Sequence, residues 1–118
     1  MNTILVIDDE VRIRDLYRIL LSSEGYQVLE AMNADSANEI LKTQPVDLVL
    51  LDLRMPQASG SVLFDVMKLF HRKVKVIVSS VYHVEQQKRL AAGATDYFDK
   101  SQSFQELFSK IETALSSA

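Results

Sequence analysis

The sequence contains no cysteine and only two histidines among its 118 residues. The absence of cysteine excludes disulfide scaffolds, thiol nucleophiles, iron–sulfur clusters and cysteine-bound zinc. His71 and His83 are too few, and too far apart in the sequence, to indicate a histidine-rich metal site. The first apolar run covers only residues 4–7 and is followed by two aspartates. It is therefore too short for a signal peptide or a membrane span.

The composition is that of an ordinary globular protein. Hydrophobic residues make up 47% of the chain and charged residues 25%, and a chain of this length typically forms one compact domain. We therefore expect a single domain over residues 1–118, without linkers or internal repeats. The formal net charge of −3 argues against a nucleic-acid interface on this domain, and no segment indicates a membrane partner. These features predict a soluble, cytoplasmic protein.

Short apolar runs alternate along the chain with longer segments of helical periodicity. Near-continuous runs of Val, Ile and Leu are typical of parallel strands that are covered on both faces. The predicted strands are residues 3–8, 26–30, 47–52, 74–79 and 95–99. Strands that alternate with helices predict an α/β fold with right-handed crossovers. We expect a flavodoxin-like, doubly wound, five-stranded parallel sheet of order 2-1-3-4-5 with five helices.

Apolar residues at i, i+3, i+4 and i+7 mark the buried faces of the predicted helices. Gly25 suits the left-handed residue that follows the first helix. Ser59 or Ser61 is the expected N-cap of the third helix, and Ser103 that of the fifth. The fourth helix, over residues 84–92, has few apolar anchors. The expected inward-facing residues are Ile13, Leu16, Tyr17 and Leu20; Ala37, Ile40 and Leu41; Leu63, Val66, Met67 and Phe70; Val84, Leu90, Ala91 and Ala92; and Phe104, Leu107, Phe108, Ile111 and Leu115.

Polar side chains follow the predicted strands at the edge where a ligand crevice is expected, beyond the carboxyl ends of the first and third strands. The first strand ends at Asp8 and Asp9, the third at Asp52, the fourth at Ser80 and the fifth at Lys100. Three carboxylates close together are tolerated only when a cation or a proton relieves their repulsion. We therefore expect a hard cation such as Mg²⁺ at this edge. A lysine and a hydroxyl beside it suit the oxygens of a phosphoryl group that one aspartate carries.

Four segments at these strand ends carry a resemblance to a known family. They read VIDDE over residues 6–10, DLRMP over residues 52–56 with Gly60 after it, Ser80 after the fourth strand, and GATDYFDK over residues 93–100. In this order the segments resemble the receiver domain of response regulators in two-component signal transduction, the CheY-like superfamily. The resemblance covers the chain from its first strand to its last helix. It implies a phosphorylation-activated regulator whose only catalysis is its own phosphorylation and dephosphorylation.

The resemblance implies how this edge binds the metal and the phosphoryl group. Asp52 is the phosphoacceptor and contributes to the Mg²⁺ site. Asp9 is the direct metal ligand, whereas Asp8 binds the metal largely through water. The backbone carbonyl of Arg54 completes the protein's share of the metal shell. Lys100 pairs with a phosphoryl oxygen as a point charge.

The resemblance also implies a switch. Ser80 donates a hydrogen bond to a phosphoryl oxygen. Tyr97 occupies the position of an aromatic residue that in the family turns inward when the hydroxyl residue moves. Pro56 and Gly60 shape the loop after the acceptor, where a fixed and a permissive φ are useful.

The implied partners are proteins. The phosphodonor is a sensor histidine kinase or a histidine phosphotransfer protein, which in the family contacts the first helix. A downstream effector protein or domain reads the switch. The resemblance also implies a phosphorylation-dependent homodimer through the face formed by the fourth helix, the fifth strand and the fifth helix.

Four residues depart from the usual family pattern. Val81 stands where the family has a very small residue, and we expect it to crowd the phosphorylation site. Tyr82 and Arg54 stand where side chains modulate the attacking water, so their bulk predicts slow hydrolysis of the aspartyl-phosphate. Ser101 replaces the proline that usually follows the lysine. Because a non-proline cis bond costs about 3 kcal/mol, we expect either a trans bond or a strained turn after Lys100.

Simpler interpretations stay open for individual residues. Asp8 or Asp9 alone would suit the N-cap of the first helix, and Tyr97 would suit a core aromatic residue. His83 is expected at the surface without an orienting partner. Three arginines are expected on a solvated face of the first helix: Arg12, Arg14 and Arg18.

The main alternative function is a receiver-like binding module that signals by protein contacts without regulated phosphorylation. Val81 and Ser101 keep this alternative open. A Mg²⁺ phosphatase with an aspartate nucleophile needs a second aspartate two positions on, where Glu10 or Val11 stands. A flavin site needs a phosphate loop rich in Gly, Ser and Thr, whereas residues 8–10 are acidic and repel phosphate unless a metal intervenes.

Overall fold

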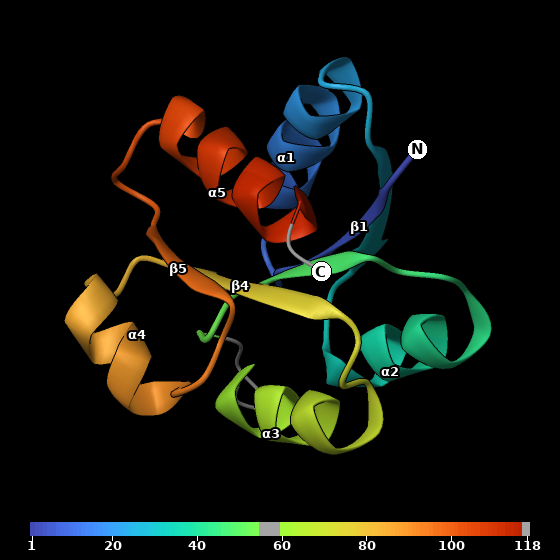
Figure 1. The fold of residues 1–118 in the computed structure, drawn as a ribbon, viewed down its shortest axis with the longest axis vertical. Coiled ribbons are helices and arrows are strands. Elements are labelled where there is room, and N and C mark those ends of the chain that lie inside the picture. Colours follow the sequence, from blue (N-terminus) through green and yellow to red (C-terminus); the bar gives the residue numbers. More distant parts are fainter. Residues whose placement is uncertain (55–59, 117–118) are drawn as a thin grey trace.

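The computed structural model in Figure 1 describes residues 1–54 and 60–116. Within these residues, strands and helices alternate along the whole chain, as the sequence predicts. The elements are β1 (Thr3–Ile7), α1 (Val11–Ser23), β2 (Gln27–Ala31), α2 (Ala34–Thr43), β3 (Leu48–Leu51), α3 (Gly60–Phe70), β4 (Lys75–Ser80), α4 (Val84–Leu90), β5 (Asp96–Asp99) and α5 (Phe104–Ser116). The strand boundaries differ from the predicted ones by at most one residue.

The strands form one sheet of order β2-β1-β3-β4-β5. Each neighbouring pair is parallel, so the predicted order and the predicted five-stranded parallel sheet are confirmed. Because all strands run the same way, their carboxyl ends lie at one edge of the sheet and their amino ends at the other. We call these the carboxyl edge and the amino edge.

Helices cover both faces of the sheet. Figure 1 shows α1 and α5 on one face and α2, α3 and α4 on the other. Successive strand residues point to opposite faces, so Leu5 and Ile7 join the core under α2 and α3, while Ile4 and Val6 join the core under α1 and α5. This two-sided burial explains why the strands read as near-continuous apolar runs.

The prediction from helical spacing that Leu16 and Phe70 face inward was wrong, because both residues are exposed. Leu21 takes the buried place in α1, and Phe64 takes it in α3. Each helix carries apolar residues on adjoining faces, so the spacing fits more than one rotation of the helix about its axis.

The fourth helix differs most from its predicted form. It ends at Leu90, which is exposed, and Ala92 is also exposed. Ala91 is buried as expected. The buried residue within α4 is the polar Gln87.

Two of the expected helix-terminal residues are confirmed. Gly25 has φ +94°, the left-handed conformation that glycine adopts without a steric penalty. The Ser103 hydroxyl accepts a hydrogen bond from the backbone N–H of Glu106.

The simpler interpretation of Asp8 or Asp9 as the N-cap of α1 is wrong, and so is Ser61 as the N-cap of α3. The N-cap of α1 is Glu10, without a side-chain hydrogen bond, so neither Asp8 nor Asp9 caps this helix. Ser61 lies inside α3, which begins at Gly60, and Ser59 lies outside the described residues. None of the helices among the described residues combines the length and the apolar character needed to cross a bilayer.

Candidate functional site

Backbone hydrogen bonds continue beyond the strand ends at the carboxyl edge and position the residues that follow them. The N–H of Asp8 donates to the carbonyl of Ala31, and the N–H of Asp52 donates to the carbonyl of Ile7. On the other side of the sheet, the N–H of Lys100 donates to the carbonyl of Ser80. Hydrogen bonds of the sheet therefore fix the backbone positions of Asp8, Asp52, Ser80 and Lys100.

Lys100 joins two of the predicted carboxylates. Its Nζ lies 2.7 Å from Oδ2 of Asp8 and 3.4 Å from Oδ2 of Asp52. The three side chains are largely removed from solvent, with exposed fractions of 12% for Lys100, 3% for Asp8 and 5% for Asp52. The structure thus brings together an ammonium group and two carboxylates from β1, β3 and β5.

Burial and charge act in opposite directions at this cluster. Burial raises the pKa of Asp52, and the negative charge of Asp8 adds to this, whereas the hydrogen bond from the Arg54 N–H and the charge of Lys100 oppose it. Burial acts to lower the pKa of Lys100, but the hydrogen bond to Asp8 and the charges of both carboxylates outweigh it, so this pKa is raised. Lys100 therefore stays cationic at neutral pH, and Asp52 is a carboxylate that would gain from further positive charge.

The loop after β1 adds more carboxylates. Carboxylate oxygens of Asp8, Asp9 and Glu10 lie within 4.8 Å of one another. The N–H of Glu10 donates to Oδ1 of Asp8, which holds this loop in place. Oxygen ligands of this kind are what Mg²⁺ takes in proteins, so the donor set fits the expected ion. Glu10 was not among the predicted ligands, although its place directly after two aspartates was the available signal.

The predicted modulating residues lie close to one another. The Arg54 guanidinium lies over the Tyr82 ring, 5.8 Å from its centroid, a cation–π contact. Arg54 is also tied to the acceptor, because its N–H donates to Oδ1 of Asp52. Val81, by contrast, is 53% exposed. The Arg54–Tyr82 contact is thus joined to Asp52 through the backbone of Arg54, and crowding of the site by Val81 stays a prediction.

The two predicted switch residues are held by nearby backbone. Ser80 is fully buried, and its hydroxyl accepts a hydrogen bond from the Tyr82 N–H at 3.4 Å. The Tyr97 ring packs against the core that lies under α3. Its hydroxyl donates to the carbonyl of Ala91 and accepts from the N–H of Ala94. Tyr97 thus links β5 to the segment that follows α4.

Gly60 lies close against the backbone of Asp52. A Cβ at this position would overlap the backbone carbonyl oxygen of Asp52, so only glycine fits without a shift of the backbone. Pro56, the other expected loop residue, lies outside the described residues.

The turn after β5 has a trans backbone. No cis peptide bond occurs among the described residues, so Lys100 and Ser101 are joined by a trans bond. The Ser101 N–H donates to Oδ1 of Asp99, and this bond is the first cause of a lowered pKa for Asp99. His83 is exposed as expected, but it has an orienting partner, because its Nδ1 lies 3.3 Å from Oδ2 of Asp99.

The expectation of a solvated Arg14 was wrong. Its guanidinium donates to the carbonyl of Asp8 at 2.6 Å and lies 3.4 Å from a carboxylate oxygen of Glu30. Arg14 thus joins α1 to the ends of β1 and β2. Arg12 is exposed as expected, and Arg18 is half-exposed and pairs with Asp15.

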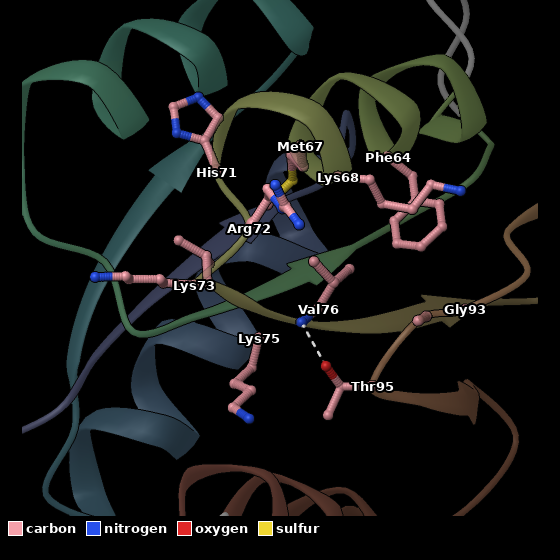
Figure 2. Close-up of a pocket in the computed structure, with 12 residues that line it drawn as sticks. Phe64, Met67, Lys68, His71, Arg72, Lys73, Lys75, Val76, Gly93 and Thr95 are labelled. Carbon is pink, nitrogen blue, oxygen red and sulfur yellow. Dashed lines mark hydrogen bonds between the residues drawn. The ribbon is translucent and has the colours of Figure 1, made fainter. Parts of the chain in front are cut away.

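A separate hollow of about 660 Å³ lies at the amino edge, between the end of α3 and the starts of β4 and β5. Figure 2 shows the cationic side chains around it. Its described lining includes no carboxylate, so it does not offer the ligands that Mg²⁺ requires. The basic residues are Lys68, His71, Arg72, Lys73 and Lys75.

The fold and the carboxyl edge are those of a phosphoacceptor domain, and the comparisons with known proteins give its family. The family model for the response regulator receiver domain matches residues 4–112 of this sequence. The chain therefore belongs to the family of response regulator receiver domains.

Curated relatives are similar over nearly the whole chain. The phosphate regulon transcriptional regulatory protein PhoB of Pseudomonas aeruginosa is 33% identical over 118 residues, which cover 97% of this chain and 52% of PhoB. The sporulation initiation phosphotransferase F of Bacillus subtilis is 31% identical over 116 residues, covering 95% of this chain and 92% of that protein. The chain thus spans about half the length of PhoB and most of the second relative.

Solved structures agree with the fold. Response regulator TrrA of Thermotoga maritima, solved in complex with Mg²⁺ and BeF, has a TM-score of 0.89 and 32% identity, covering 97% of this chain and 99% of that chain. The structure of histidine kinase ThkA in complex with TrrA gives a TM-score of 0.90 and 34% identity, covering 98% of this chain and 100% of that chain.

Proposed function

We propose that this chain is a phosphorylation-activated receiver domain that accepts a phosphoryl group on Asp52 and then switches protein–protein interactions. The observation that carries the proposal is the placement of Lys100 between the buried carboxylates of Asp8 and Asp52, beside further acidic ligands. We propose that residues 1–118 act as one such domain in the cytoplasm, with no catalysis other than phosphorylation and dephosphorylation of Asp52.

The proposed phosphodonor is a phosphohistidine of a sensor histidine kinase or of a histidine phosphotransfer protein. A carboxylate oxygen of Asp52 forms a bond to phosphorus while the P–N bond breaks. The leaving imidazole nitrogen keeps the bonding electron pair and takes up a proton. A kinase complex of TrrA, a similar protein, supports a donor of this class.

The residues that would hold Mg²⁺ are Asp8, Asp9, Asp52 and the carbonyl of Arg54. When bound, the ion supplies positive charge that offsets the carboxylates and the phosphoryl oxygens. Lys100 supplies a second positive charge and keeps it there, because its pKa is raised. As the Asp52 carboxylate becomes an acyl phosphate, Lys100 can turn from it to a phosphoryl oxygen.

Ser80 and Tyr97 are the proposed switch. Ser80 would donate a hydrogen bond from its hydroxyl to a phosphoryl oxygen, which would draw the hydroxyl away from the Tyr82 N–H that it meets at 3.4 Å. Tyr97 would respond because it is anchored to the segment after α4. The proposed reading surface is the face of α4, β5 and α5, for an effector or for a second phosphorylated copy.

The test is transfer of radiolabel from a small acyl phosphate in Mg²⁺ buffer. We expect label on the unmodified protein and on Asp65→Asn, which removes an exposed carboxylate of α3, but not on Asp52→Asn. Label on Asp52→Asn equal to that of the unmodified protein would contradict Asp52 as the acceptor. Absence of label from all three proteins would favour the alternative, a receiver-like module that signals without phosphorylation.

A further inference from the structure

One polar side chain in α4 is fully buried. Gln87 has no exposed surface, although it lies on a seven-residue helix whose other residues reach solvent. The adjacent glutamine, Gln86, is exposed on the same helix, so a glutamine in α4 need not be buried. The reason for the burial of Gln87 therefore lies in the groups that its side chain contacts.

The Gln87 amide nitrogen reaches three backbone carbonyls. Its Nε2 lies 2.7 Å from the carbonyl oxygen of Tyr82, 3.0 Å from that of Phe98 and 3.5 Å from that of Ser80. An NH₂ group carries two hydrogens, so it cannot make three full hydrogen bonds at once. The bond to Ser80 is the longest and weakest of the three.

The other amide atom has no partner. Oε1 of Gln87 is buried without a hydrogen bond within the described residues. Such a group costs free energy and calls for an explanation. The amide cannot be reversed, because Oε1 would then face three carbonyl oxygens. The explanation therefore lies in what Nε2 holds.

Nε2 holds the backbone on both sides of Val81. The Ser80 carbonyl also accepts the N–H of Lys100, and the Ser80 hydroxyl meets the Tyr82 N–H. The turn from Ser80 to Tyr82 is thus fixed by its own hydroxyl, by β5 and by Gln87 from α4. A hydroxyl can accept one hydrogen bond and donate another, but movement of the Ser80 hydroxyl toward a phosphoryl oxygen lengthens its contact with the Tyr82 N–H, which is already 3.4 Å long. The first of these restraints is then weakened, and the Tyr82 backbone is free to shift.

We propose that Gln87 is a positioning residue for Ser80 that stabilises the resting place of the Ser80–Tyr82 turn over the phosphoryl-engaged one. This inference rests on the proposed function of Asp52 and Ser80. Because Nε2 is shared among three carbonyls, a shift of Tyr82 removes its shortest bond. Gln87 therefore opposes engagement of Ser80, and its removal favours engagement. A ligand shifts such an equilibrium only by its different affinity for the two states.

The test uses Gln87→Met, which has similar length but neither donates nor accepts in the same way. Beryllofluoride, with Mg²⁺, takes the place of the phosphoryl group and is the probe for the state in which Ser80 engages it. The half-saturating concentration of beryllofluoride is measured by NMR titration of the backbone amide signals. We expect Gln87→Met to lower this concentration roughly tenfold, the equilibrium change that loss of one buried hydrogen bond typically causes. Gln86→Met, the matched control on the same helix, leaves it unchanged. Urea denaturation of each variant measures stability separately.

The outcomes separate the inference from the proposed function. A Gln87→Met protein with lower stability but an unchanged half-saturating concentration overturns the inference, because Gln87 is then merely structural. A higher concentration also overturns it. If Gln87→Met does not fold, Gln87→Asn, a shorter amide, is expected to lower the concentration to a smaller extent, and an unchanged value overturns the inference. If the unmodified protein shows no beryllofluoride response, or one that Asp52→Asn retains, the proposed function itself fails and the inference fails with it.

Discussion

The two edges of the sheet carry charge in opposite ways. At the carboxyl edge, Lys100 is nearly buried and lies between two carboxylates. At the amino edge, Arg72, Lys73 and Lys75 surround an open hollow (Figure 2), and none of the described carboxylates lies within ion-pair distance of them. The two edges therefore differ in how their cations are placed: Lys100 is paired and nearly buried, whereas these three cations have no carboxylate partner among the described residues.

The difference shows what burial does to a charge. In solvent a cation needs no partner, because water stabilises it, and pairing contributes little. In a poorly solvated site each charge depends on its neighbours, so removal of one leaves the others uncompensated. The carboxyl edge can therefore respond strongly to one added or lost charge, whereas the amino edge cannot.

Replacement of Lys100 is the most direct test of this difference between the two edges. We expect Lys100→Met to destabilise the metal-free protein by about 3 kcal/mol, because the carboxylates of Asp8 and Asp52 then face one another unpaired. Lys75→Met, the control at the amino edge, is expected to change stability by no more than about 0.5 kcal/mol. Urea denaturation in EDTA measures both. Equal losses for the two variants would show that burial does not separate the edges.

The pH dependence of the Lys100 effect has a defined sign. The pKa of Lys100 is raised, so its contribution is complete at neutral pH and is lost only as pH rises through the raised value. In Lys100→Met the penalty comes from ionised carboxylates, and the pKa of Asp52 is itself raised by burial. The difference between the two proteins is therefore expected to shrink as the pH is lowered and Asp52 takes up a proton. A difference that grows on acidification would contradict this account.

Addition of Mg²⁺ is the second largest expected effect. An ion that binds only the folded protein stabilises it by about 2 kcal/mol at a concentration roughly twentyfold above its Kd. We expect millimolar binding, because the protein offers few ligands. Asp9→Ala is expected to lose most of the stabilisation, and Lys75→Met to keep it. Thermal denaturation in MgCl₂, beside NaCl of equal ionic strength, separates site binding from screening. An equal response to both salts would count against a metal site.

The lifetime of the aspartyl-phosphate is the third expected effect. The backbone N–H of Arg54 donates to Asp52, and the Arg54 guanidinium lies over the Tyr82 ring, with no acid or amide side chain at either position to orient a water. We expect phospho-Asp52 to persist for many minutes to hours. Tyr82→Glu is expected to shorten this roughly tenfold, a change of about 1.4 kcal/mol in the barrier.

The control for this lifetime is Leu69→Glu, which adds the same charge at an exposed site of α3. Its aspartyl-phosphate is expected to decay at the rate of the unmodified protein. Decay of the unmodified protein within seconds, or equal rates for Tyr82→Glu and the unmodified protein, would show that this pair does not slow hydrolysis.

Much of the fold could be predicted from the sequence because the strands are buried on both faces. Apolar runs such as residues 48–51, too short for a helix and bounded by polar residues, indicate buried strands. Their alternation with helices indicates a parallel sheet, and five strands favour the flavodoxin-like order. The rotation of α1 and α3 was harder to predict, because apolar residues such as Leu16 and Phe70 lie beside the truly buried ones. Tertiary contacts, rather than spacing, decide which face turns inward.

The contacts of the candidate site also fall into those that the sequence predicts and those that it does not. Asp8, Asp52 and Lys100 could be predicted to meet, since each follows a strand end at one edge. The contacts of Arg14 with Glu30 and of Gln87 with three carbonyls could not, because neither residue follows a strand end and the helical spacing of apolar residues does not place a polar side chain. A polar residue in a short helix gives no sign of its burial.

The smallest expected effect concerns His83, an exposed cation when protonated that lies at the carboxyl edge. Its ring is 91% exposed and meets Asp99 at 3.3 Å. The pKa of Asp99 is lowered first by the Ser101 N–H, and His83 adds less. The benefit of ionised Asp99 is therefore present above the ordinary pKa of an aspartate and is lost as pH falls through the lowered value, with or without His83. We expect His83→Ala to change the urea midpoint only slightly at neutral pH, because the ring is exposed and contributes less to Asp99 than the Ser101 N–H does. A large loss at neutral pH would show that position at this edge, rather than burial, makes a charge important.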